Sequence, residues 1–109
     1  MRFSLPALTI AVLSGLSVAD AKVCARCADT IVYSFQTRQL TLVRQSSVST
    51  LNTVQCNYDS PSISGFSPYC VYNNINGSLY FTNTGSACPT PVPTFTVTDT
   101  RCPTKFPAA

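Results

Sequence analysis

Histidine, glutamate and tryptophan are all missing from this chain of 109 residues. Without histidine, the chain lacks the usual base of Ser-His-Asp and Cys-His catalysis and the imidazole ligand of most catalytic metal sites. Without glutamate, the two carboxylates of a glycosidase would have to be aspartates. After the first twenty residues only Asp29, Asp59 and Asp99 remain, and each has the neighbours of a turn or strand-end residue. We therefore expect no enzymatic activity and no cofactor.

Charged side chains are scarce, and they do not cluster. Seven basic and four acidic residues give a net charge of +3 at pH 7. The basic residues are scattered along the chain, whereas nucleic-acid-binding domains gather theirs in a patch or stripe. We expect no nucleic-acid partner, and instead an extracellular protein or a polysaccharide.

Long apolar runs are also absent, apart from one at the start of the chain. Arg2 is followed by a mostly apolar run from Phe3 to Val18 and then by small residues. This layout is typical of a secretory signal peptide, here residues 1–21, with cleavage after Ala19 or Ala21. The run is too short and too often interrupted by polar residues to span a bilayer. We expect a secreted, extracellular product without stable membrane insertion.

Cysteine, by contrast, is abundant, and every cysteine follows the predicted signal peptide: Cys24, Cys27, Cys56, Cys70, Cys88 and Cys102. An even set in a short exported chain predicts three disulfides. Zinc binding would require a second closely spaced pair, and a redox motif would require a helix after a strand; neither pattern is present. A bridge between Cys24 and Cys27 would close a very short loop with little entropic benefit. We expect these two to bond to different distant cysteines, although the pairing is not determined by the sequence.

The rest of the chain alternates polar with β-branched or aromatic residues in short runs, at 30–35, 39–45, 53–58, 69–73, 78–84 and 94–100. Such runs predict β-strands, and in the first run Ile31, Tyr33 and Phe35 would share one face. The cysteine pair would precede the first strand. We predict an all-β domain over 22–102, a small disulfide-stapled sandwich or barrel-like meander of five or six short strands, followed by a loose tail over 103–109.

Asn76–Gly77 predicts a two-residue hairpin turn, because both residues tolerate positive φ. Counting outward from such a turn places Cys70 opposite Asn83, with Cys88 beyond the ladder. A cross-strand Cys70–Cys88 disulfide is therefore disfavoured, and a longer path between the two cysteines stays open. Asn76 also begins an N-glycosylation sequon, which marks it as a candidate glycan site.

Two further features are candidate binding surfaces. The first is the set of tyrosines whose rings would contact a sugar or cell wall if exposed: Tyr58, Tyr69, Tyr72 and Tyr80. The second is the loop 59–68 between Cys56 and Cys70, which could enter a protease cleft with Phe66 or Ile63 as its anchor.

Several segments together resemble a known group of proteins. After a signal peptide come "CARCADTIVYSF", "QCNYDSPSISGFSPYCVYNN" and a threonine-rich end. This pattern resembles the small secreted cysteine-rich proteins of mushroom-forming fungi, over about Cys24 to Pro89. The resemblance implies secretion and an effector-like role, and it supplies no catalytic residue. The leading hypothesis is a non-enzymatic binding protein at a cell surface or in the extracellular space; a carbohydrate-binding module and a protease inhibitor are the alternatives.

Overall fold

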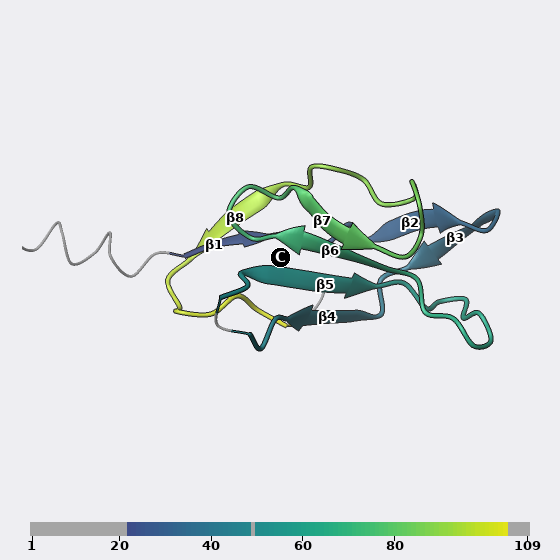
Figure 1. Cartoon of the computed structure of the whole chain (residues 1–109), viewed down its shortest axis with the longest axis horizontal. Helices are drawn as coiled ribbons and strands as arrows, with labels where there is room; N and C mark the ends of the chain where they lie inside the picture. The colour runs from purple at the N-terminus through teal and green to yellow at the C-terminus, as the bar shows by residue number, and fades with distance from the viewer. Residues whose placement is uncertain (1–21, 49, 105–109) are drawn as a thin grey trace, which may run out of the picture.

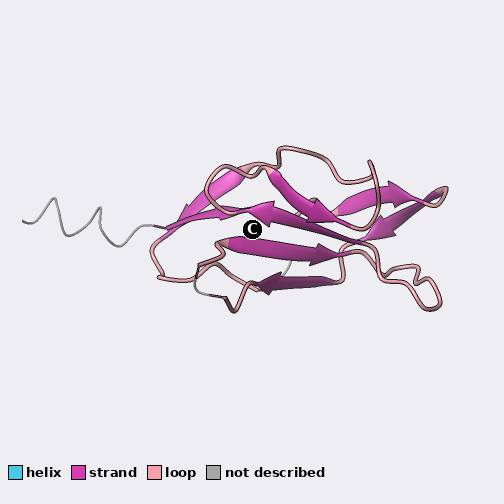
Figure 2. Cartoon of the chain, in the orientation of Figure 1, coloured by secondary structure: helices cyan, strands magenta, loops and turns pink. Residues whose placement is uncertain are grey.

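The computed structural model describes residues 22–48 and 50–104 (Figure 1). The predicted signal peptide and most of the predicted tail lie outside these residues. Within them the chain forms strands and loops and no helix (Figure 2). The strands are β1 (Lys22–Ala25), β2 (Thr30–Tyr33), β3 (Gln36–Gln39), β4 (Leu42–Gln45), β5 (Thr53–Asn57), β6 (Tyr69–Asn73), β7 (Leu79–Thr82) and β8 (Thr94–Val97).

The all-β fold is therefore confirmed, with eight strands where five or six were predicted. One additional strand is β1, which contains Cys24, so the prediction that the cysteine pair precedes the first strand is wrong. Its four residues, KVCA, are too few to show a clear alternation, and the segment is extended because it pairs with β8 at the other end of the domain. The other arises because residues 36–45 form two strands, β3 and β4, that belong to different sheets.

The strands form one four-stranded antiparallel sheet in the order β4-β5-β6-β7, and two two-stranded sheets, β1-β8 and β2-β3. Successive residues of a strand point to opposite faces. In β6 this gives buried Cys70 and Tyr72 on one face and half-buried Tyr69, Val71 and Asn73 on the other. The four-stranded sheet thus has an inner face and an outer face.

The core lies on the inner face of this sheet. Side chains from β4, β5 and β6 pack there against the two small sheets and the connector before β8. The buried residues that meet include Val43, Val54, Cys56, Tyr58, Cys70, Tyr72, Ala25, Cys27, Ile31, Leu40 and Val92. This two-layer arrangement buries the alternate apolar residues that the sequence pattern indicated.

The first hairpin departs from the predicted pattern. The chain turns at Ser34 and Phe35, which have φ values of 55° and 64°, instead of continuing as a strand to Phe35. Positive φ at both central residues is the signature of a type I′ turn, which normally requires Asn or Gly. Phe35 consequently projects from the apex of the hairpin with a relative exposure of 102%. The prediction that it shares one face of a strand with Ile31 and Tyr33 is wrong.

The connection between β6 and β7 is longer than the two-residue turn predicted from Asn76–Gly77. The N–H of Asn73 donates to the carbonyl of Ser78, so four residues lie between the closing pair. Asn74, which the prediction placed in the ladder, is instead buried in tertiary contacts. A register shift between Val71 and Tyr72 adds to the difference.

No helix long and apolar enough to cross a bilayer occurs in residues 22–48 and 50–104.

Candidate functional site

Three disulfides join Cys24 to Cys102, Cys27 to Cys56 and Cys70 to Cys88, with S–S distances of 2.03, 2.02 and 1.96 Å. Cys24 and Cys27 bond to different distant partners, as predicted. Cys27–Cys56 and Cys70–Cys88 connect the inner face of the four-stranded sheet to the opposite layer. Three such bonds are typical of proteins that fold in an oxidising compartment, and they are consistent with an extracellular location.

The Cys70–Cys88 bond contradicts the prediction from the hairpin register. Cys70 lies opposite Thr82 instead of Asn83. After Thr82 the chain turns sharply, with the N–H of Thr84 donating to the Thr82 hydroxyl. The turn carries Cys88 back to Cys70, with 5.9 Å between their Cα atoms. The strand register did not predict this disulfide, because Cys88 lies in a loop that folds back over the sheet and has no partner in the ladder.

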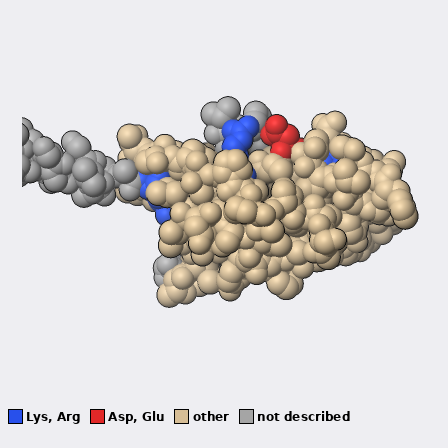
Figure 3. Space-filling view, turned by 90° about the horizontal axis from the view of Figure 1, so that it is seen from above, with Lys and Arg blue, Asp and Glu red and all other residues tan. Residues whose placement is uncertain are grey.

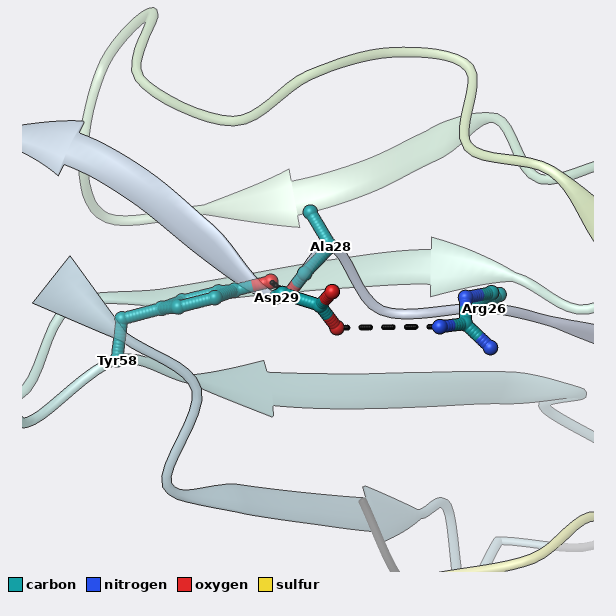
Figure 4. A network of polar contacts seen from close by, with 4 residues as sticks. All are labelled: Arg26, Ala28, Asp29 and Tyr58. Atoms are coloured by element: carbon teal, nitrogen blue, oxygen red, sulfur yellow. Dashed lines mark hydrogen bonds and ion pairs between the residues drawn. The ribbon is translucent and has the colours of Figure 1, made fainter. Parts of the chain in front are cut away.

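Tyr58 and Tyr72 are fully buried, so they cannot serve as the exposed sugar platforms that were predicted. The Tyr58 hydroxyl donates to the carbonyl of Ala28 at 2.8 Å (Figure 4), and the Tyr72 hydroxyl donates to the carbonyl of Pro89 at 2.6 Å. Burial raises the pKa of Tyr72 to about 12. Burial, followed by the neighbouring Tyr72 and Asp29, raises the pKa of Tyr58 further. Both rings are structural, because each joins the two layers through a buried hydroxyl.

A different pair of aromatic rings lies on the outer face of the four-stranded sheet. Tyr69 of β6 and Phe81 of β7 have ring centroids 6.0 Å apart and planes inclined by 36°. Phe81 is 55% exposed and Tyr69 is half-buried. Tyr80 is also exposed, but it is the neighbour of Phe81 in β7 and takes no part in this pair. The sequence singled out tyrosines, and the phenylalanine was missed because its face depends on the β6–β7 register.

Polar side chains continue this outer face across β5 and β4. Val71 pairs with Phe81 on one side and Gln55 on the other, and Gln55 pairs with Arg44. The Gln55 side chain donates to the Asn57 side chain at 3.0 Å. Directly paired residues share a face, so one row contains an aromatic ring, an amide and a guanidinium. We call the surface of Arg44, Gln55, Tyr69, Val71 and Phe81 the outer-face patch.

A series of side-chain hydrogen bonds continues from Asn57 and fixes the side chains at the edge of the outer-face patch. The Asn57 amide donates to the Ser67 hydroxyl at 2.9 Å, and Ser67 donates to Asp59 at 2.8 Å. Thr41 donates to the other Asp59 oxygen at 3.3 Å. These bonds attach the loop 59–68 to the sheet, and the amide of Gln55 is oriented as a consequence.

The predicted anchor of the loop 59–68 is already in contact within the molecule. Phe66 stacks on Tyr33 of β2, with ring centroids 5.7 Å apart and planes 19° from parallel. Buried Arg38 donates to the carbonyls of Tyr33 and Pro61 at 2.9 and 2.5 Å, which fastens the loop to the first hairpin. The aromatic ring that projects at this end of the molecule is therefore Phe35 instead of Phe66.

The three aspartates lie in different parts of the structure. Asp29 is 3.9 Å from Arg26 in an exposed ion pair (Figure 4), Asp59 is bonded to hydroxyls, and Asp99 lines an open groove of about 700 Å³ beside Arg101. Asp29 lines a different pocket, and neither of these two pockets of the described residues contains a second aspartate. Within the same residues, no group of three potential metal ligands is found.

Asn76 is exposed, as a glycan site requires, although occupancy stays a prediction. Its Oδ1 accepts hydrogen bonds from the N–H and the hydroxyl of Ser78 at 3.0 and 2.8 Å. These bonds involve only the oxygen, so the Nδ2 atom to which a glycan attaches is left without an internal bond in the described part of the chain.

An apolar pocket of about 280 Å³ lies where the segment before β2 meets the connector before β8. Its lining is Arg26, Cys27, Ala28, Asp29, Pro89, Pro91, Val92 and Pro93, and we call it the proline pocket. The N–H of Arg26 donates to the carbonyl of Pro93 at 2.9 Å, which holds the two segments together.

Comparisons of the chain with protein-family models, with curated proteins and with solved structures gave no match.

Proposed function

We propose that this chain is a secreted, non-enzymatic binding protein and that it binds a polysaccharide through the outer-face patch. The observation that carries the proposal is the contact between Tyr69 and Phe81 beside the Gln55 and Arg44 side chains on one face. Its setting would be a cell surface or the extracellular space, in an effector-like role such as the sequence resemblance implies.

The chemistry of the patch suits a sugar ligand. A sugar ring presents apolar C–H groups on its faces and hydroxyls around its rim. Aromatic rings supply apolar contact area, while amides and guanidinium groups donate to hydroxyl oxygens. The mixture of a few directed polar groups with an apolar surface is characteristic of ligand sites. The scattered aspartates support binding over hydrolysis, because a glycosidase requires two carboxylates across one site.

The test is retention of the purified secreted protein on insoluble chitin, cellulose and β-1,3-glucan. We expect retention on at least one of them, and Phe81→Ala and Tyr69→Ala should each weaken it by roughly tenfold, about 1.4 kcal/mol. Phe35→Gly is the matched control, because it removes an exposed aromatic ring at a different surface and should leave retention unchanged. Retention on none of the three would refute the polysaccharide, and retention that survives both patch variants would refute the site.

A further inference from the structure

The apex of the β2–β3 hairpin exposes a large apolar side chain at an unfavourable backbone position. Phe35 is fully exposed at φ 64°, and Val32 on the same hairpin is 67% exposed. A phenylalanine in the left-handed region is strained, and such strain is typically maintained where function requires it. The hydrogen bonds of Arg38 and the stacking of Tyr33 on Phe66 attach the hairpin to the loop 59–68 and so restrict its movement. The Phe35 ring is therefore exposed and held in one position, which suits it to contact an apolar surface of a partner.

The edge of β2 beside this apex is unpaired. β2 pairs with β3 only. Tyr33 and Gln36 close the two-residue turn as a hydrogen-bonded pair, so the N–H and C=O of Val32 point away from β3. No backbone bond from Val32 to another segment is found in residues 22–48 and 50–104. An open edge with exposed valine is a template for another strand.

We propose that β2 pairs antiparallel with β2 of a second copy of this chain, and that each Phe35 enters the proline pocket of the other copy. We place the two-fold axis so that Val32 lies opposite Val32 of the second copy. Each residue of β2 then pairs with the residue of the second copy for which the two residue numbers add to 64. Tyr33 then lies opposite Ile31 of the second copy. Ser34 and Phe35 form the turn and are outside this ladder, so the apex of one copy extends past Thr30 of the other, toward residues 27–29, which line the pocket.

The chemistry of the pocket fits the ring. A cavity of about 150 Å³ can hold benzene, and this open pocket is larger, at about 280 Å³. Three prolines and Ala28 supply apolar contacts, and Arg26 at the rim can stack on an aromatic face.

Charge does not oppose this association. The segment 30–37 contains no charged residue. In Figure 3 the end of the molecule that carries the hairpin is almost free of charged side chains. Two copies, each carrying a net positive charge, can therefore approach here without like-charge repulsion.

A second copy accounts for these features better than a lipid bilayer does. Adsorption to a bilayer scales with the apolar area inserted and is strengthened by basic residues nearby. One phenyl ring and one valine offer little area, and the hairpin has no basic side chain exposed at its apex. An apolar pocket within the same chain, lined in part by the residues directly before β2, favours self-association. The interface is small, so the dimer should be weak, with a Kd of roughly 10–1000 µM.

The first test is sedimentation equilibrium of the purified protein over a concentration series. We expect a reversible monomer–dimer equilibrium. Phe35→Gly should weaken it roughly a hundredfold, because the two-fold axis removes two buried rings at once. Glycine also relieves the positive φ, so this variant should fold at least as stably as the parent. Phe81→Ala is the matched aromatic control and should leave the dimer unchanged.

The second test is complementation between two defective variants. Ala28→Arg fills the pocket and leaves Phe35 in place, so it should not dimerise with itself. A mixture of Ala28→Arg with Phe35→Gly restores one ring in one pocket, so the heterodimer should be stronger than either homodimer. Absence of that recovery would refute the ring-in-pocket contact.

Three other outcomes would overturn the proposal. One is a protein that stays monomeric at millimolar concentration. Another is a series of larger species, which would indicate a head-to-tail chain without a two-fold axis. The third is a monomer that co-sediments with phosphatidylcholine vesicles only when Phe35 is present, which would assign the ring to a bilayer. Polysaccharide retention is a separate measurement when it is made far below the dimer Kd, where each copy binds through one outer-face patch: it then depends on Tyr69 and Phe81, whereas the dimer depends on Phe35 and Ala28.

Discussion

At the scale of single residues, Gly77 is the position where the fold tolerates no side chain. Its φ is +75°, and a Cβ atom placed there would lie 2.1 Å from the carbonyl oxygen of Val92. That carbonyl belongs to the backbone of the connector, and the Val92 N–H donates to the carbonyl of Gly77. Glycine is required here by close approach of two backbones as well as by the turn.

Gly77→Ala should therefore destabilise the protein by about 3 kcal/mol or more, since the strain of positive φ and a backbone clash are combined. Gly65→Ala is the matched control, because Gly65 has the same φ of +75° and open space around it. It should cost only about 1–2 kcal/mol. Chemical denaturation of both variants measures the difference, and equal losses would show that the Val92 contact is unimportant.

The raised pKa values of the buried Tyr58 and Tyr72 hydroxyls predict that the protein loses stability at alkaline pH. The pKa of Tyr72 is raised to about 12 in the folded protein, against an ordinary value of 10.0. Below pH 10 the hydroxyl is protonated in both states, so its contribution is fully present. Between pH 10 and 12 only the unfolded chain ionises, and the free energy of unfolding falls as pH rises. The raised pKa of Tyr58 extends this slope in the same direction.

The measurement is urea denaturation at several pH values from 8 to 11.5. Tyr72→Phe should be less stable at pH 8, because the carbonyl of Pro89 loses its partner, and should show a shallower decline above pH 10. Samples returned to pH 8 must recover the original curve, which separates titration from alkaline cleavage of disulfides. An unchanged slope in Tyr72→Phe would contradict the assignment.

At the scale of secondary-structure elements, Asn74 connects three parts of the chain through one buried amide. Its Oδ1 accepts from the N–H of Ala25 in β1 at 2.9 Å, and its Nδ2 donates to Gln45 in β4 and to Asn52, both at 3.1 Å. Its side chain is 1% exposed. The hairpin predicted from the sequence placed Asn74 in its ladder and did not indicate its burial, since burial of an amide depends on which distant partners surround it.

Asn74→Asp should destabilise the protein by about 3 kcal/mol or more at pH 7. The replacement has nearly the same shape, but it loses both donated bonds and places a carboxylate against two acceptor oxygens, one of which already accepts a hydrogen bond from the Lys22 ammonium at 3.1 Å. Thermal denaturation measures the loss, which should shrink at low pH as the carboxyl is protonated. The matched control is Asn76→Asp, an exposed residue that uses only its oxygen, and it should change the stability little.

At the scale of the whole molecule, the three disulfides close loops of different length and should differ in their contributions. The sequence separations are 78, 29 and 18 residues for Cys24–Cys102, Cys27–Cys56 and Cys70–Cys88. The chain-entropy relation assigns them about 4.5, 3.6 and 3.2 kcal/mol. The first of these joins the two ends of the described domain.

Replacing each pair by alanine should therefore lower the free energy of unfolding most for Cys24–Cys102. Chemical denaturation of the three double variants gives the order, and non-reducing peptide mapping of the parent verifies the pairing first. If Cys70–Cys88 proved the most important, packing around the bridge would outweigh loop closure. Free thiols in the folded parent would refute the disulfide framework itself.

The sequence by itself determined the fold class and the chemistry that holds it together. Period-two alternation identified most of the strands, six cysteines in an exported pattern predicted three disulfides, and the short loop between Cys24 and Cys27 disfavoured a bond between them. These are local or pairwise properties, and they depend on spacing alone. The absence of histidine and glutamate likewise restricted the chemistry without any need for coordinates.

Only the tertiary structure decided which partners meet and which rings are exposed. Tyr58 and Tyr69 each lie within two residues of a cysteine in the sequence, yet Tyr58 is buried under a second layer and Tyr69 lies on the outer face. Phe35 follows the alternation of a strand, but Arg38 and the loop 59–68 stabilise a turn there. Cys88 reaches Cys70 because a loop folds back over the sheet. In each case the outcome depends on contacts between segments distant along the chain, which local patterns do not contain.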